Sequence, residues 1–196
     1  MVPIREPPPR APNDPFLDKL VSSFVAYAKR VMEESGLRTV SPLWNTYPES
    51  VILVRTYMRH LPPDFRLEHP ALCQCVRSLR LTCWGLMTML RLMGRTHSPT
   101  LNQEVEWLVH ALELLGMDIE KAIVGVREAV EVSYIYQALV RIRREEDRYY
   151  ELLNWSMIHH DPRLPFYEFA WTILYPMKEW ILSLLDEVAH VHFRRY

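Results

Sequence analysis

Residues 117–160 constrain the fold of this chain most, because they contain no proline and a single glycine, Gly125. Proline and glycine are the residues that most often interrupt a helix. Gly116 precedes the stretch, and Asp118 lies where acidic side chains suit a helix N-terminus. Pro162 follows it, and the residue before a proline is pushed out of the helical region. We therefore expect one long helix over this stretch.

The rest of the chain divides into shorter helices at its prolines and glycines. The first, from the cap at Asn13 or Asp14 to about Ser35, has apolar residues at the three-to-four spacing of an amphipathic helix. The other expected helices cover about 48–59, 70–93, 98–115 and 165–193, the last with a kink at Pro176. No strand pattern with period two is visible. The predicted fold is all-α, a bundle of about six helices around the long one.

We expect two parts, an extended arm over residues 1–15 and a helical domain over residues 16–196. Six prolines lie between positions 3 and 15. Proline fixes φ and removes backbone donors, so this arm must be extended and polyproline-like. It is either a terminus without contacts or a strap that lies on a neighbouring subunit.

Composition limits the class of protein. Apolar residues make up 49% of the chain, which excludes a disordered protein, and the formal charge of −1 gives no overall basic field. No stretch of eighteen uncharged apolar residues occurs and the N-terminus is proline-rich, so we expect neither a membrane span nor a secretory signal. Amides are scarce and arginine far outnumbers lysine. Scarce amides are typical of a thermophile, whereas the arginine excess is explained as simply by a high-GC coding bias.

The most basic surface comes from the segment between positions 66 and 95, where five arginines stand against one acidic residue, Glu68. Arginine contacts to phosphates position a protein on nucleic acid without reading its sequence. Our candidates for contact with the nucleic-acid backbone are two arginines of the arm and the five of this segment: Arg5, Arg10, Arg66, Arg77, Arg80, Arg91 and Arg95.

The charged run over residues 141–148 is a weaker candidate, because its acidic residues would repel a phosphate. We expect it to be mainly a solvated helix face. Of the aromatic residues beside it, Tyr149, Tyr150 and Trp155, we expect core positions more than base stacking.

Catalytic and metal-binding patterns are weak. Cys73, Cys75 and Cys83 lack a fourth ligand of matching spacing, so we expect buried thiols. Glu187 and His190 have the Glu-x-x-His spacing of di-iron bundles, but no second copy occurs. The five glycines provide neither a nucleophile elbow nor a phosphate-binding loop. We expect no enzymatic activity, no cofactor and no bound metal.

The composition favours association with other protein chains over catalysis. Six tryptophans and ten tyrosines exceed what one core of this size needs. Tryptophan, tyrosine, methionine and arginine are enriched at protein interfaces.

An all-helical subunit with a proline-bearing arm, few amides and many arginines resembles the coat proteins of filamentous viruses of hyperthermophilic archaea. That resemblance covers the whole chain as a profile and implies a subunit that wraps duplex DNA in a helical sheath. Three short stretches, over residues 61–65, 69–74 and 83–88, are similar in order to stretches of hepadnavirus core proteins, which are also helical capsid subunits. The helix between the first two stretches of that family is missing here, and the chain ends without an arginine-rich tail.

These observations favour a structural, self-assembling subunit, most readily a viral coat protein or nucleoprotein found in a virion or otherwise in the cytoplasm. Its partners would be other copies or a second subunit type, and a nucleic-acid backbone bound non-specifically. The rival is a small helical adaptor that binds a partner protein through a groove lined by Met87, Met89 and Met93. A di-metal carboxylate enzyme is the third alternative.

Overall fold

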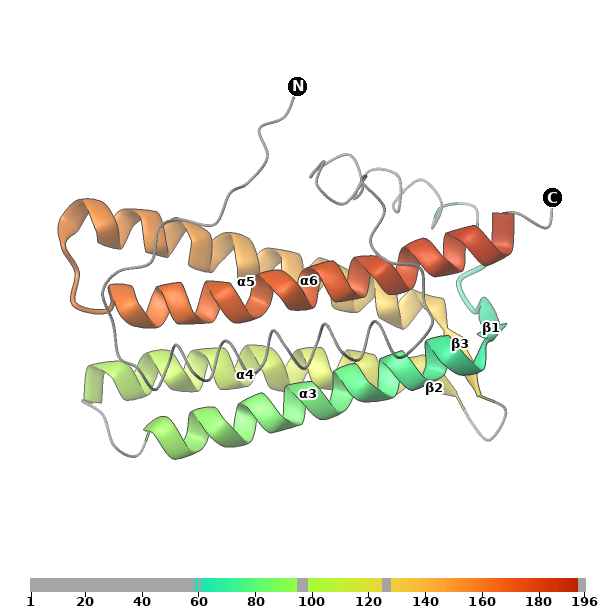
Figure 1. The fold of residues 1–196 in the computed structure, drawn as a ribbon, viewed down its shortest axis with the longest axis horizontal. Helices are drawn as coiled ribbons and strands as arrows, with labels where there is room; N and C mark the ends of the chain where they lie inside the picture. The colour runs from blue at the N-terminus through green and yellow to red at the C-terminus, as the bar shows by residue number, and fades with distance from the viewer. Residues whose placement is uncertain (1–58, 60, 95–98, 125–127, 194–196) are drawn as a thin grey trace, which may run out of the picture.

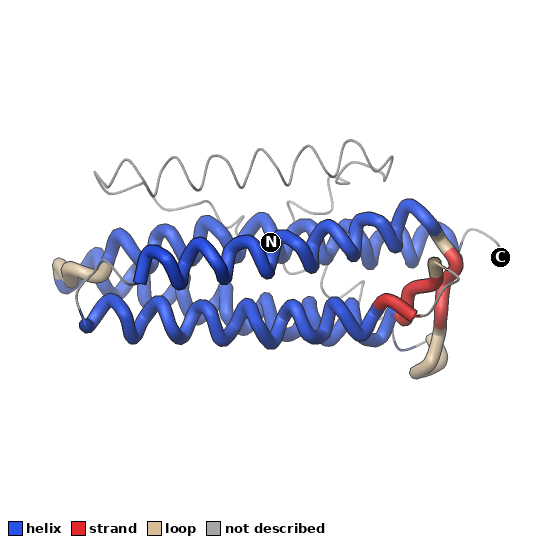
Figure 2. Tube along the Cα trace, turned by 90° about the horizontal axis from the view of Figure 1, so that it is seen from below, coloured by secondary structure: helices blue, strands red, loops and turns tan. Residues whose placement is uncertain are grey.

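The computed structural model describes residues 59, 61–94, 99–124 and 128–193. Four long helices dominate this part: α3 (Pro70–Gly94), α4 (Pro99–Ala122), α5 (Val132–His159) and α6 (Leu164–Phe193). They lie side by side, and each runs antiparallel to the one before it (Figures 1 and 2). The expectation of a mainly helical protein is confirmed.

A small antiparallel sheet lies at one end of this bundle (Figure 1). Its strands are β1 (Arg66–Glu68), β2 (Ile123–Val124) and β3 (Ala129–Glu131), in the order β1-β3-β2. Val130 in the middle strand lies opposite Leu67 on one side and Ile123 on the other. We expected no strand from the sequence, and that prediction is wrong.

The sheet also divides the single helix expected over residues 117–160. Helix α4 ends at Ala122, β2 and β3 form a hairpin, and α5 begins at Val132. Branched apolar residues such as Ile123 and Val130 favour strands, and β3 has a neighbour on each side for its backbone groups. Glu128 in the hairpin adopts a left-handed φ of 52°. Pairing with β1, which is distant in the sequence, outweighs the local helical preference.

We expected Gly116 to end a helix, but it lies inside α4. A Cβ atom at this position would lie 3.6 Å from the Cβ of Cys83 on α3, so the glycine marks a close approach of α3 and α4. Asp118 does not begin a helix either. Its Oδ2 accepts a hydrogen bond of 2.7 Å from Nε of Arg141, which ties α4 to α5.

Other expected boundaries agree with the structure. Helix α3 ends at Gly94, and α6 begins next to Pro165 and continues through Pro176. Helix α5 ends at His159 because His160 turns left-handed and the Asp161 N–H donates to the Ser156 carbonyl at 3.0 Å. The arm and the first expected helix lie outside the described residues, and so does the second apart from Arg59, which is helical.

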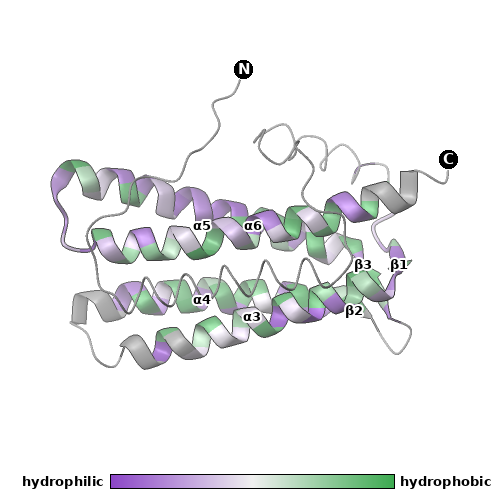
Figure 3. Cartoon of the chain, in the orientation of Figure 1, coloured by the Kyte–Doolittle hydropathy of each residue, from purple (hydrophilic) through white to green (hydrophobic). Residues whose placement is uncertain are grey.

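The core is formed by apolar side chains from all four helices. Helix α5 is the most hydrophilic of the four and α6 the most hydrophobic (Figure 3). Cys73, Cys75 and Cys83 are buried free thiols, as expected, and burial raises the pKa of Cys83 to about 12. None of the helices in the described residues is long and apolar enough to cross a membrane.

Candidate functional site

The exposed face of α3 brings together three of the candidate arginines. Arg77 and Arg91 are separated by fourteen residues, close to four helical turns, and therefore lie on the same side of the helix. Arg80 lies one turn after Arg77. Trp84 is midway between Arg77 and Arg91 and is 41% exposed, and Leu81 is 59% exposed. We call these five residues the α3 face.

Ion pairs reduce the positive charge near the α3 face. Nη1 of Arg80 lies 3.8 Å from Oε1 of Glu120 on α4. Arg66 precedes α3 in β1, and its Nη2 lies 3.9 Å from Oε2 of Glu131 on β3. Both pairs are partly exposed, so water and salt screen them. Arg5, Arg10 and Arg95 lie outside the described residues.

The charged run on α5 is not uniformly solvated, which corrects the sequence analysis. Glu146 is fully buried. Its Oε2 lies 3.3 Å from Nζ of Lys178, and its Oε1 accepts a 3.0 Å hydrogen bond from Nε1 of Trp171. Lys178 is also buried, and its ammonium lies 4.6 Å from the centre of the Tyr175 ring. Together these residues form a polar centre between α5 and α6.

Sequence reasoning missed this centre. A signal was present on α6, because Lys178 stands in the most hydrophobic helix and a lysine there needs a partner. Nothing local identified Glu146 among its charged neighbours. Of the neighbouring aromatic residues, Tyr149 lies in the core, as expected. Trp155 does not, because it is 48% exposed and its ring lies tilted against that of His159.

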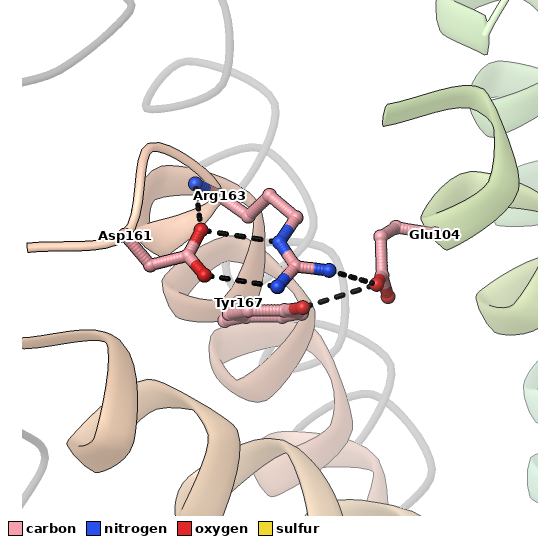
Figure 4. Close-up of polar contacts among 4 residues, drawn as sticks. All are labelled: Glu104, Asp161, Arg163 and Tyr167. Atoms are coloured by element: carbon pink, nitrogen blue, oxygen red, sulfur yellow. Dashed lines mark hydrogen bonds and ion pairs between the residues drawn. The ribbon is translucent and has the colours of Figure 1, made fainter. Parts of the chain in front are cut away.

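A second polar cluster lies at the end of the bundle opposite the sheet (Figure 1), and Figure 4 shows its four residues. Arg163 donates from Nε and Nη2 to the two carboxylate oxygens of Asp161, at 3.1 and 2.9 Å, and from Nη1 to Glu104 at 3.2 Å. The Tyr167 hydroxyl donates to the same Glu104 oxygen at 3.0 Å. Burial, followed by this bond to Glu104, raises the pKa of Tyr167 to about 12. The cluster ties α4 to the start of α6.

Glu187, which has the Glu-x-x-His spacing with His190, contacts a histidine that precedes α3, and the side chain of His190 lies outside the described part. Oε1 of Glu187 lies 3.4 Å from Nε2 of His69. Nδ1 of His69 accepts the Leu72 N–H at 3.1 Å, so this histidine caps the start of α3. Over the described ranges, no group of three or more His, Cys, Asp or Glu side chains could hold a metal ion.

Large apolar side chains are exposed on α3, α4 and α5. They are Leu81, Trp84, Trp107, Met117, Val140, Trp155 and Ile158. Met87 is buried with 1% exposure, so it cannot line an open groove as the adaptor alternative requires. The side chains of Met89 and Met93 lie outside the description.

Comparison with known protein families, curated protein sequences and solved structures returns no match. The function must therefore be argued from the site itself.

Proposed function

We propose that this protein is a structural subunit that self-assembles into a coat around nucleic acid, in a helical or shell-like arrangement. The observation that carries the proposal is the α3 face, where partly exposed Arg77 and exposed Arg91 flank exposed Trp84 on one side of a long helix. The rigid bundle behind α3 would keep these side chains in a fixed row.

The arginines of this face would contact phosphates without reading bases. Arg77 and Arg91 lie about 21 Å apart along the helix at 1.5 Å per residue, a separation that spans several phosphates. Arg80 contributes less, since Glu120 lies beside it. Each phosphate contact releases counterions, so binding should weaken steeply as salt rises.

The distribution of exposed apolar residues supports self-assembly over a single binding groove. Trp84, Trp107 and Trp155 lie on three different helices. A coat subunit touches several neighbours and needs apolar contacts on more than one side. An adaptor with one partner needs one continuous patch, and the buried Met87 removes part of the patch expected for it.

The test is electron microscopy of the purified protein, alone and with linear duplex DNA, at low and at high salt. The proposal expects filaments or shells that form with DNA at low salt and disappear as salt is raised. Uniform small particles under all conditions would contradict it, and would favour the adaptor alternative. Particles that form equally well without DNA would retain self-assembly but remove nucleic acid from the proposal.

A further inference from the structure

Helix α5 has an outward face that runs along most of its length. Six exposed residues follow one another at steps of three, four or seven, the spacing of one side of a helix. They are Gln137, Val140, Arg144, Glu151, Trp155 and Ile158. The buried residues of α5 lie on the opposite side, since Leu139, Ile142 and Leu153 point into the core. We call the six exposed residues the α5 face.

The α5 face combines apolar and charged side chains. Val140, Trp155 and Ile158 are all exposed, Ile158 to 74%. Single apolar residues are normal on a surface, but three large ones on one side of one helix are typical of an interaction site. Arg144 and Glu151 lie between Val140 and Trp155 along the helix. Among the described residues, neither of these two charged side chains has an ion-pair partner.

The charges of the α5 face are arranged symmetrically. Arg144 and Glu151 lie equally far from the middle of the face, which falls between residues 147 and 148. If two copies of α5 pack antiparallel about a two-fold axis through this point, Arg144 of each copy faces Glu151 of the other. A parallel pairing in register would instead place like charges opposite each other. The charges therefore favour the antiparallel arrangement.

The apolar residues fit the same axis. Val140 and Trp155 are also equally far from the middle of the face, so each Val140 would pack on Trp155 of the other copy. Gln137 and Ile158 would face each other at the two ends, where the contact meets solvent. Two apolar contacts would therefore flank two ion pairs along a helix segment of about 30 Å, at 1.5 Å per residue.

Helix α4 adds apolar surface near this axis. The guanidinium of Arg148, beside the axis, lies 5.2 Å from the centre of the Trp107 ring. Trp107 is 52% exposed, so it borders the α5 face close to its middle. The two copies of Trp107 would flank the axis and widen the contact beyond one helix.

We infer that the α5 face is a two-fold interface through which two copies of this protein pair antiparallel. The inference rests on the proposed function, because it names one contact by which a self-assembling subunit joins a neighbour. A two-fold contact is closed and cannot grow by itself. The dimer would be a building block that other surfaces join into the coat.

The experiment measures dimer formation of the full chain by sedimentation velocity, without nucleic acid. Arg144→Glu or Glu151→Arg alone places like charges opposite each other on both sides of the axis. We expect each single variant to weaken the dimer at least tenfold. The double variant Arg144→Glu, Glu151→Arg restores opposite charges and should dimerise within threefold of the wild type.

An equimolar mixture of the two single variants is the matched control. A pair with one chain of each kind has opposite charges at both contacts, so the mixture should form heterodimers about as stable as the wild-type dimer. The two positions are about 10 Å apart along α5, so pairing within one chain cannot explain this recovery. Single variants that dimerise like the wild type, or a mixture that does not recover, would overturn the inference.

Cysteine crosslinking checks the register of the two helices. The three native cysteines are buried. Chains with Gln137→Cys and chains with Ile158→Cys are mixed and oxidised. We expect a disulfide-linked heterodimer from the mixture and no linked dimer from either variant alone. Linked dimers from Gln137→Cys alone would show a parallel pairing and overturn the inference.

Failure of this inference is distinguishable from failure of the proposed function. The two single charge variants leave the α3 face unchanged, so the DNA affinity of one subunit should stay near that of the wild type. DNA-dependent filaments from a protein that does not pair through α5 would overturn the inference and retain the proposed function. A dimer with the expected charge dependence that forms no assembly with DNA would retain the interface and contradict the proposed function.

Discussion

Glu146 and Lys178 place two ionisable side chains in the core between α5 and α6. Removing a charge from water is costly unless its partner and its hydrogen bonds replace the lost solvation. Here the Lys178 ammonium and the Trp171 N–H both contact the Glu146 carboxylate. The attraction between the two charges therefore mainly compensates for the cost of burying them and adds little net stability.

We predict that Lys178→Met lowers the free energy of unfolding by about 3 kcal/mol, because it leaves a buried carboxylate without its cation. The double variant Glu146→Gln, Lys178→Met should recover more than half of the loss, since glutamine is neutral and can still accept from Trp171. Urea denaturation of the two variants and of Glu146→Gln measures both effects. A single variant as stable as the wild type would contradict this account.

Asp161 should make stability depend on acid pH. Its hydrogen bonds from the Arg163 side chain hold the pKa of Asp161 below the ordinary value. Such a carboxylate contributes stability above its unfolded pKa of about 3.9, and the contribution is lost as pH falls through the lower folded pKa. We predict that Asp161→Asn lowers the urea midpoint by a constant amount above pH 5, and that the difference from wild type shrinks below pH 4.

The control for Asp161→Asn replaces the other residue of the ion pair, Arg163. At neutral pH, Arg163→Met should lower the midpoint at least as much as Asp161→Asn, because Arg163 also donates to Glu104. The double variant should lose less than the sum of the single variants. Additive losses, or a difference independent of pH, would show that the contact does not act on stability in this way.

At the scale of elements, the effect of a glycine or a proline on a helix depends on what packs beside it. Gly116 and Gly85 both lie inside helices. A Cβ at Gly116 would meet Cys83 at ordinary contact distance, whereas a Cβ at Gly85 would meet nothing within 4 Å. Pro176 lies within α6, which continues past it.

We predict that Gly85→Ala and Gly116→Ala each stabilise the protein by up to about 1 kcal/mol, because alanine favours a helix over glycine. A larger residue separates the two sites. Gly116→Leu should destabilise by about 1–3 kcal/mol, since its side chain must enter the packed contact between α3 and α4. Gly85→Leu, on the exposed side, should not. Thermal unfolding of the four variants checks this, and equal effects of the two leucines would contradict the close approach at Gly116.

For the whole molecule, the residues that hold the bundle together are separate from those that are exposed for association. The interior of the bundle holds the packed core and the buried Glu146–Lys178 pair, whereas the α3 face and the exposed tryptophans point outward. Substitutions on the α3 face should therefore alter association and leave the fold intact.

We predict that changing Arg77, Arg80 and Arg91 together to glutamate abolishes binding to duplex DNA at low salt. Single Arg77→Glu or Arg91→Glu variants should lower the slope of log K against log salt by about 0.9 for each lost contact. Arg144→Glu, an exposed change on α5, is the matched control. Fluorescence anisotropy at several salt concentrations gives the slopes. If the triple variant binds like the wild type, the nucleic-acid site is not on α3.

Sequence by itself determined the helical class, the bounds of α3, the ends of α5 and α6, and the burial of the three cysteines. Those features depend on residues close together in the chain, such as Gly94 after an apolar run or Pro162 after His160. Only the tertiary structure decided the hairpin within the expected long helix and the partners of Glu146 and Glu187. The hairpin needs β1, more than fifty residues earlier, and Glu146 needs Lys178 from the next helix. Pairing across such distances is favourable only once the helices have packed, because neither the strands nor the buried charges are stable alone.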